Sequence, residues 1–347
     1  MSETYDALLV VSFGGPEGAA DVMPFLENVL RGRNVPRERM EQVAHHYDLF
    51  GGVSPINGQN RKLIAALRAE LDTHHVTLPV YWGNRNWHPF LADELRRMRG
   101  DGIRRALAFV TSAYSSYSGC RQYREDIERA RAEVGEGAPQ VDKLRAFYNH
   151  PGFVGPNAEN LRAALDQVPA GRRDAARVAF TAHSIPSAMA AGCDYEPQLL
   201  ETCRLVAEGA GVDRWRLVFQ SRSGSPMQPW LGPDICDHLR ALKNEGATDV
   251  VVAPVGFISD HMEVLYDLDT EARAVAAEIG VNMIRAATVG THPAFVSMIR
   301  EIILERTDGA PRRALGTHGA RQDACAVDCC LPGATARPAA RPSADAR

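Results

Sequence analysis

This chain of 347 residues lacks any hydrophobic run that approaches the roughly 20 apolar residues of a membrane helix. Residues 1–6 also lack the basic and apolar segments of a secretory signal. Positive charge is not in excess, because the formal net charge is -4 and no basic stretch offers a footprint for nucleic acid. We therefore expect a cytoplasmic protein without a transmembrane segment that does not bind nucleic acid.

Cysteine is scarce, and its number is odd. Seven cysteines in a chain without a secretory signal do not predict a disulfide framework. After Thr307 the sequence becomes rich in Gly, Ala, Pro, Arg and Asp and poor in large apolar residues. We therefore expect residues 308–347 to form an irregular tail, although three of the cysteines gather there.

Short apolar segments alternate with longer amphipathic ones along the chain. The segments with strand character are 7–13, 78–83, 105–111, 177–182, 216–220, 250–257 and 281–287. The segments with helical periodicity are 58–71, 90–98, 123–133, 158–168, 196–210, 233–243, 267–279 and 292–305. This alternation predicts an α/β fold with parallel sheets joined by right-handed crossovers.

The length and a hydrophobic content of 45% suffice for two cores, since single cores stop growing at roughly 250 to 300 residues. The strands form an early and a late group, and the glycine- and proline-rich segment 151–156 is typical of a turn between them. We predict two doubly wound domains that face each other across a cleft, 1–152 and 153–307, followed by the tail 308–347. The last helix, 292–305, closes the second domain or reaches back to the first.

A nucleotide-binding loop is also missing. The first strand runs into Ser-Phe-Gly-Gly-Pro-Glu-Gly at 12–18, which lacks the G-x-G-x-x-G spacing, and Pro16 has no amide to offer a phosphate. The glycines instead suit a tight turn over a ligand cleft. We therefore expect no nucleotide cofactor.

Three carboxylates follow the apolar segment 250–257. Glu263, Asp267 and Glu271 are four residues apart and so share one face of a helix. Like charges at that spacing cost roughly a few tenths of a kcal/mol each unless a cation binds. A solvated acidic face is one interpretation. A metal site is the other, and the position at the carboxyl end of a buried strand favours it.

A histidine, His183, ends the strand predicted at 177–182. A lone histidine is more often structural than catalytic. If the two strands are neighbours, however, His183 and Glu263 face each other across the floor of the cleft. An imidazole opposite a carboxylate can bind a divalent metal or accept a proton at pH 7.

Two loops combine aromatic rings with hydroxyl groups. Tyr47 and Ser54 belong to 47–57, and Tyr123 ends 114–123. Such a surface suits a flat apolar ligand with polar substituents, although ordinary loops carry the same residues. Arg31 is a candidate partner for a carboxylate of that ligand.

Six motifs together closely resemble the ferrochelatases, in order from about residue 5 to residue 305. They are SFGGP at 12–16, GGVSP at 51–55, GNRNWHP at 83–89, AHSIP at 182–186, PWLGP at 229–233 and VGFISDHMEVLYD at 255–267. The resemblance implies the chelatase fold, with two Rossmann-like domains and parallel four-stranded sheets, and the insertion of ferrous iron, the metal substrate, into a porphyrin. The bacterial coproporphyrin III ferrochelatases, which lack membrane-insertion elements, are the most similar branch.

The resemblance also implies roles for particular residues. It makes His183 and Glu263 the catalytic and metal-binding pair, and it makes Asp267 and Glu271 an outer metal path to solvent. The residues that it places at the porphyrin are Ser54, Tyr123, Tyr47, Arg31 and Phe13.

Three positions differ from related bacterial enzymes, which often carry Tyr in place of Phe13 and Arg in place of Leu30 and His46. Phe13 cannot supply a phenolate ligand to the inserted iron, and the resemblance matches the metal pair more fully than it matches the contacts to the porphyrin propionates.

Some ferrochelatases hold a [2Fe-2S] cluster through one cysteine of a mid-domain loop and three of a C-terminal extension. Cys120 aligns with the first of these, and Cys325, Cys329 and Cys330 are available for the others. Four thiolates are the usual complement of such a cluster. Zinc is a competing occupant, and a disordered tail with incidental cysteines is the third interpretation.

Other functions stay open at this point. One alternative is a chelatase of the same fold that inserts cobalt or nickel into another tetrapyrrole, and another is a non-catalytic carrier of haem or metal. The pairing of His183 with Glu263 favours the enzyme, because a carrier needs no proton acceptor beneath the ring. Protoporphyrin IX is the alternative to coproporphyrin III, since that choice rests on the family branch alone. We expect a monomer that contacts neighbouring enzymes of haem biosynthesis only transiently.

Overall fold

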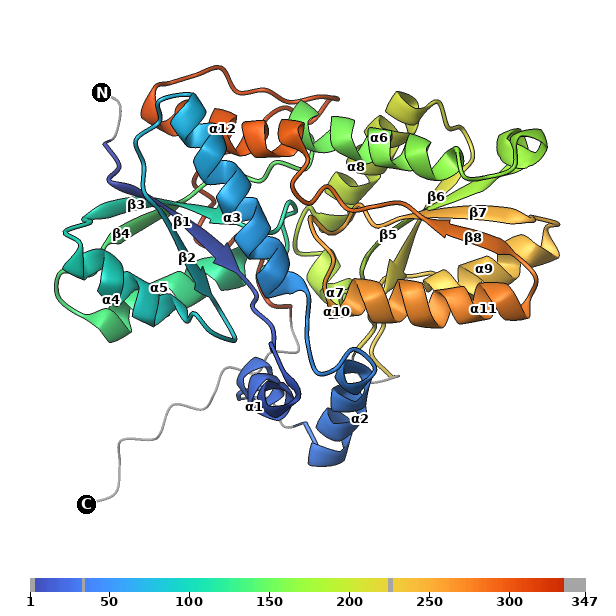
Figure 1. Cartoon of the computed structure of the whole chain (residues 1–347), viewed down its shortest axis with the longest axis horizontal. Coiled ribbons are helices and arrows are strands. Elements are labelled where there is room, and N and C mark those ends of the chain that lie inside the picture. Colours follow the sequence, from blue (N-terminus) through green and yellow to red (C-terminus); the bar gives the residue numbers. More distant parts are fainter. Residues whose placement is uncertain (1–3, 33–34, 224–226, 334–347) are drawn as a thin grey trace.

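The computed structural model describes residues 4–32, 35–223 and 227–333, and these contain two four-stranded parallel sheets (Figure 1). The first sheet is built from β1 (Ala7–Ser12), β2 (Val80–Asn84), β3 (Arg105–Val110) and β4 (Gln140–Lys143), in the order β2-β1-β3-β4. The second is built from β5 (Arg177–His183), β6 (Trp215–Gln220), β7 (Asp249–Ala253) and β8 (Asn282–Arg285), in the order β6-β5-β7-β8. The same strand order therefore occurs twice, which confirms the predicted α/β fold.

Helices cover both faces of each sheet (Figure 1). On the first sheet, α3 (Ile56–Thr73) and α12 (Pro293–Thr307) lie on one face, and α4 (Leu91–Gly100) and α5 (Gln122–Val134) lie on the other. On the second sheet, α6 (Pro151–Leu165) and α8 (Tyr195–Ala210) lie on one face, and α9 (Ile235–Asn244) and α11 (Arg273–Glu278) lie on the other. The remaining helical elements are α1 (Ala19–Val29), α2 (Arg37–Asp48), η1 (Tyr117–Arg121), η2 (Ala170–Ala175), α7 (Ser187–Ala190), α10 (Met262–Val264) and η3 (Leu265–Ala272).

The central strands are apolar because both of their faces are buried. Leu8 and Val10 of β1 point into the core that contains α3, whereas Leu9 and Val11 point into the core that contains α4 and α5. Successive side chains of a strand alternate between faces, so a strand between two helical layers has no polar side. This is why the apolar segments of the sequence predict the inner strands well.

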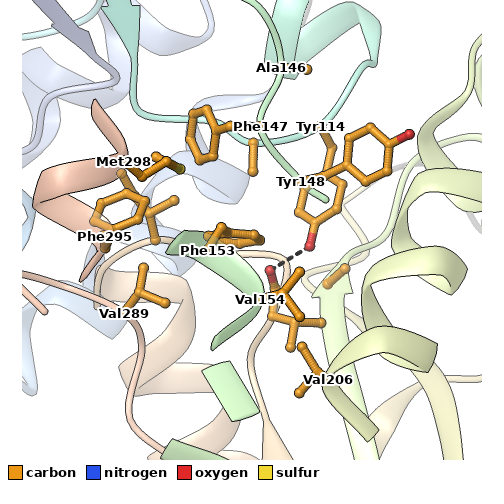
Figure 2. Packing of buried hydrophobic residues seen from close by; sticks show 14 of the residues in the cluster. Tyr114, Ala146, Phe147, Tyr148, Phe153, Val154, Val206, Val289, Phe295 and Met298 are labelled. Atoms are coloured by element: carbon orange, nitrogen blue, oxygen red, sulfur yellow. Dashed lines mark hydrogen bonds between the residues drawn. The ribbon is translucent and has the colours of Figure 1, made fainter. Parts of the chain in front are cut away.

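One continuous hydrophobic core joins the two sheets (Figure 2). Phe147 packs edge-on against Phe153 with the ring centroids 5.6 Å apart, and it lies 5.9 Å from the ring of Phe295. Tyr114, in the loop after β3, donates a hydrogen bond of 2.8 Å to the carbonyl of Val255, in the loop after β7. The loops at the carboxyl ends of the two sheets are therefore fixed relative to each other.

The structure corrects the sequence prediction at 151–156, which is the start of α6 and not a turn. Pro151 occupies the first helical turn, where its missing amide costs nothing, and the His150 side chain caps the helix by accepting a hydrogen bond from the amide of Gly152. A Cβ on Gly152 would lie 2.6 Å from the carbonyl of Ala294, so glycine here allows α12 to approach α6. The predicted domain boundary after residue 152 stays a prediction.

Among the described residues, no helix has both the length and the apolar character needed to cross a membrane. The described part of the tail, 308–333, contains neither helix nor strand, and the rest of the predicted tail, 334–347, lies outside the described residues. It is nevertheless fixed to the body of the protein. The amide of Leu315 donates to the carbonyl of Asn149 at 2.8 Å, and the amide of Thr317 donates to Glu201 at 2.9 Å.

Candidate metal and porphyrin site

The structure brings His183 and Glu263 together at the carboxyl end of the second sheet. His183 is the last residue of β5, which lies between β6 and β7. Glu263 lies in α10, which the chain reaches through the loop that follows β7. His183 Nε2 lies 3.4 Å from Glu263 Oε1, and the two side chains are 32% and 48% exposed. The pair is therefore accessible from solvent.

The imidazole of His183 is held in one orientation. Its Nδ1 faces the backbone carbonyl of Ser184, which can only accept a hydrogen bond, so Nδ1 carries a proton. The hydroxyl of Tyr195 donates to the carbonyl of His183 at 2.9 Å and fixes the end of the strand. Nε2 is therefore the nitrogen that faces Glu263 and can exchange a proton or bind a metal.

The two groups titrate as an ion pair. Desolvation opposes the charged form of each, but the charge and hydrogen bond of Glu263 outweigh it and raise the pKa of His183 to about 9. In the same way, desolvation opposes ionisation of Glu263, but His183 lowers the pKa of Glu263 to about 2. The imidazole is therefore protonated at neutral pH, and a metal ion has to displace that proton to bind Nε2.

The acidic residues beyond Glu263 form a connected row. Desolvation, together with the like charges of Glu263 and Glu271, raises the pKa of Asp267 to about 7, although a hydrogen bond from Ser221 opposes the shift. Desolvation and Asp234 raise the pKa of Glu271. Most of this segment is the π-helix η3 rather than the α-helix that the four-residue spacing predicts. Single π-turns inside helices occur frequently at functional sites.

Two of the residues expected at the porphyrin belong to one small hydrophobic cluster. Tyr47 packs in it with Phe25 of α1 and Met262 of α10, and Phe13 packs against it. Met262 directly precedes Glu263. Phe13 and Tyr47 therefore belong to a group of side chains that includes the neighbour of Glu263.

Ser54 and Tyr123 are each only 5% exposed. A Cβ on Gly15 would lie 2.7 Å from Ser54 Cβ, so glycine at this position leaves room for the serine. The Tyr123 ring packs in the core of the first sheet, with the Arg85 guanidinium 4.4 Å from its centroid.

Arg31 follows α1 and is exposed. Its guanidinium donates to the side chain of Asn28. The roles of Ser54, Tyr123 and Arg31 at the porphyrin stay predictions.

The ferrochelatase family model matches residues 5–307. The chain belongs to the ferrochelatase family. It is 56% identical over 329 residues to the ferrochelatase of Rhodopirellula baltica, covering 94% of this chain and 93% of that protein. It is 53% identical over 359 residues to the coproporphyrin III ferrochelatase of Streptomyces coelicolor, covering 97% of this chain and 96% of that protein. The chain is accordingly an enzyme of haem and porphyrin biosynthesis.

Solved structures confirm the chelatase fold. SirB from Bacillus subtilis with Fe3+ superposes with a TM-score of 0.50 at 14% identity, covering 87% of this chain and 97% of SirB. DR2241 from Deinococcus radiodurans, described as structurally similar to chelatases, superposes with a TM-score of 0.51 at 14% identity, covering 88% of this chain and 55% of DR2241. At these identities the likeness concerns the fold alone.

The structure adds residues to the candidate site that the sequence analysis missed. Gln220 ends β6 in register with His183, and its amide donates to the carbonyl of Glu263 at 3.1 Å. His261 caps the start of α10, where its Nδ1 accepts a hydrogen bond of 3.2 Å from the amide of Glu263. Gln220 could be found only from the strand order. His261 could have been found from the sequence, because it lies two residues before Glu263, at the position where a side chain caps the start of a helix.

A second group of side chains lies where the tail meets η1. The Cys120 thiol hydrogen-bonds Cys325, which lowers the pKa of Cys325 to about 7. Cys329 Sγ and Cys330 Sγ are 3.4 Å apart. Arg121, next to Cys120, donates to the carbonyls of Val327 at 2.7 Å and Cys329 at 3.1 Å, so the tail is held against η1. Within the described residues, no three His, Cys, Asp or Glu side chains are arranged around one metal ion.

Proposed function

We propose that this ferrochelatase inserts ferrous iron into coproporphyrin III and that His183 and Glu263 carry the reaction. The observation that supports the site is the 3.4 Å contact between His183 Nε2 and Glu263 Oε1 in an accessible position at the carboxyl end of β5. Ligands of open α/β sheets gather at such strand ends. The choice of porphyrin is supported by the relative from Streptomyces coelicolor, which matches over nearly the full length of both chains.

The chemistry requires a proton acceptor beside the ring. A free-base porphyrin carries two pyrrole N–H groups, and both protons leave as Fe2+ binds the four nitrogens. Once its imidazole is neutral, His183 accepts one of these protons at Nε2, the other leaves to water, and the carboxylate of Glu263 stabilises the imidazolium that results. Before Nε2 takes that proton, the same pair can offer one nitrogen and one oxygen ligand to the incoming iron. Asp267 and Glu271 form the outer part of the metal path.

The porphyrin choice can be tested because coproporphyrin III has four propionate arms and protoporphyrin IX has two. Each carboxylate that is bound by a charged or backbone donor adds about 1.5 to 3 kcal/mol. We expect kcat/KM with Fe2+ under anaerobic conditions to be at least about tenfold higher for coproporphyrin III.

An equal or reversed ratio would overturn the choice of porphyrin and leave the ferrochelatase activity standing. Turnover with cobalt or nickel but not with iron would point to the rival chelatase. Tight porphyrin binding without turnover of any metal would point to a carrier.

We also propose that the cysteines of the tail hold a [2Fe-2S] cluster. The donor set of such a cluster is four thiolates, and the tail and η1 supply the thiols of Cys120, Cys325, Cys329 and Cys330. Each of the two irons binds two of these thiolates, so the cluster does not require three cysteines around a single ion. Cys330 is 2% exposed, and its backbone φ of 56° lies in the left-handed region that residues other than glycine rarely adopt. When bound, the cluster supplies a cross-link between the tail and η1.

Protein purified without oxygen is expected to be brown, with about two irons and two acid-labile sulfides per chain. Cys330→Ser should lose the colour and the sulfide, because one of the four thiolates is gone. The matched control is Cys236→Ser, which removes a thiol on α9 outside the group and should keep both. One zinc per chain without sulfide, or a colourless protein whose tail thiols react freely, would contradict the cluster.

A further inference from the structure

An aromatic contact joins two parts of the protein that are far apart in the sequence. The imidazole of His46, in α2, stacks on the phenol ring of Tyr266, in η3, with the centroids 3.7 Å apart and the planes 9° from parallel. Both side chains are half-buried. Desolvation, followed by the charges of Arg39 and His45, lowers the pKa of His46, so a neutral imidazole makes this contact at neutral pH.

Each ring is also tied to one side of the proposed site. His46 precedes Tyr47, which packs in the hydrophobic cluster with Met262. Tyr266 lies between Glu263 and Asp267, and its hydroxyl hydrogen-bonds the carboxylate of Glu271. The stack therefore connects a helix that carries a predicted porphyrin contact with the helix that carries the acidic path.

The position of α2 shows which parts of the protein this contact holds together. Helices α1 and α2 lie side by side below the two sheets, and they do not belong to the helical layers that cover the faces of the sheets (Figure 1). They belong to the first half of the chain, whereas Met262 and Tyr266 belong to the second. The cluster around Tyr47 and the stack of His46 on Tyr266 thus hold α2 against the second half of the protein.

We propose that the His46–Tyr266 stack is a latch that holds α2 against η3 and so couples porphyrin retention to the acidic metal path. This inference rests on the proposed function of the site. His46 and Tyr266 are positioning residues in this scheme, since neither ring needs to touch the reacting atoms. The ring of Tyr266 holds α2, and its hydroxyl orients Glu271.

The test separates these two roles of Tyr266. His46→Ala should increase the porphyrin dissociation rate about three- to tenfold, the range that one aromatic pair contributes, and His46→Phe should restore the wild-type rate. Tyr266→Phe keeps the ring, so it should leave porphyrin release unchanged and raise the KM for Fe2+. Porphyrin release is measured by stopped-flow fluorescence without metal, and KM is measured by continuous absorbance of the metallated product.

The coupling is measured with a double variant. If the rings act as one latch, His46→Ala combined with Tyr266→Ala should release porphyrin no faster than either single variant. Additive effects, or a wild-type release rate in His46→Ala, would overturn the latch. Because release is measured without metal, these outcomes do not depend on chelation. Failure of the proposed function would instead appear as absence of turnover in the wild-type protein.

Discussion

Replacement of His183 with alanine is expected to abolish iron insertion while porphyrin affinity changes by no more than a few fold. The imidazole Nε2 lies 3.4 Å from Glu263 Oε1, whereas Nδ1 of His261 lies 3.9 Å from Glu263 Oε2 and already accepts a hydrogen bond from the amide of Glu263. Loss of a positioned acid–base group typically costs roughly a hundred- to ten-thousand-fold in rate. Loss of a metal ligand from the same atom adds to that cost.

The measurement is kcat/KM with Fe2+ together with the porphyrin dissociation constant from fluorescence quenching. His74→Ala is the matched control, because His74 is an exposed histidine that follows α3, and its imidazole contacts Glu70 of that same helix. The control should retain wild-type values of both quantities. Wild-type turnover in the His183 variant would show that the site has been placed wrongly, and a large loss of porphyrin affinity would show that His183 acts mainly in binding.

The sequence predicted the fold wherever burial produces a pattern. The inner strands β1, β3, β5 and β7 are apolar on both faces, and the prediction placed each within a few residues. The edge strand β4 was not located, because it reads Gln-Val-Asp-Lys and is half exposed, so no apolar run marks it. The helices α1 and α2 were missed as well, and only Tyr47 is buried in α2.

The candidate site could be predicted where it depends on strand ends. His183 and Glu263 each follow an apolar strand, and parallel strands deliver their carboxyl ends to one edge of a sheet. The stack of His46 on Tyr266 depends on how two halves of the chain meet, and no periodicity encodes that. Likewise, the change from α- to π-helix in η3 leaves the four-residue spacing of the carboxylates intact and so stays invisible in the sequence.

The structure of the tail could likewise be predicted only in part. Its composition predicted a lack of regular structure, and the described part, 308–333, contains neither helix nor strand. Its place on the protein depends on single contacts with buried groups, such as those of Asn149 and Glu201, which are ordinary polar residues in the sequence. The approach of Cys325 to Cys120 follows from these contacts.

Replacement of Glu263 with glutamine is expected to lower kcat/KM at pH 7.5 by roughly a hundredfold or more and also to change its pH dependence. With Glu263 present, the pKa of His183 is raised to about 9, so the neutral imidazole increases about tenfold per pH unit up to that value. Glutamine has no charge. The desolvation that remains lowers the pKa of His183, so the acid limb of the kcat/KM profile should end at a lower pH.

Neutralising the outer carboxylates provides the matched contrast. Asp267→Asn combined with Glu271→Gln removes two charges from the same row, and we expect it to raise the KM for Fe2+ several-fold and to spare porphyrin affinity. Glu263 and His183 remain in this double variant, and Glu263 is the main source of the raised pKa of His183, whereas Asp267 contributes less. The acid limb of the kcat/KM profile of this double variant should therefore stay close to that of the wild type. If both variants affected only the KM for Fe2+, Glu263 would belong to the metal path and His183 alone would carry the proton chemistry.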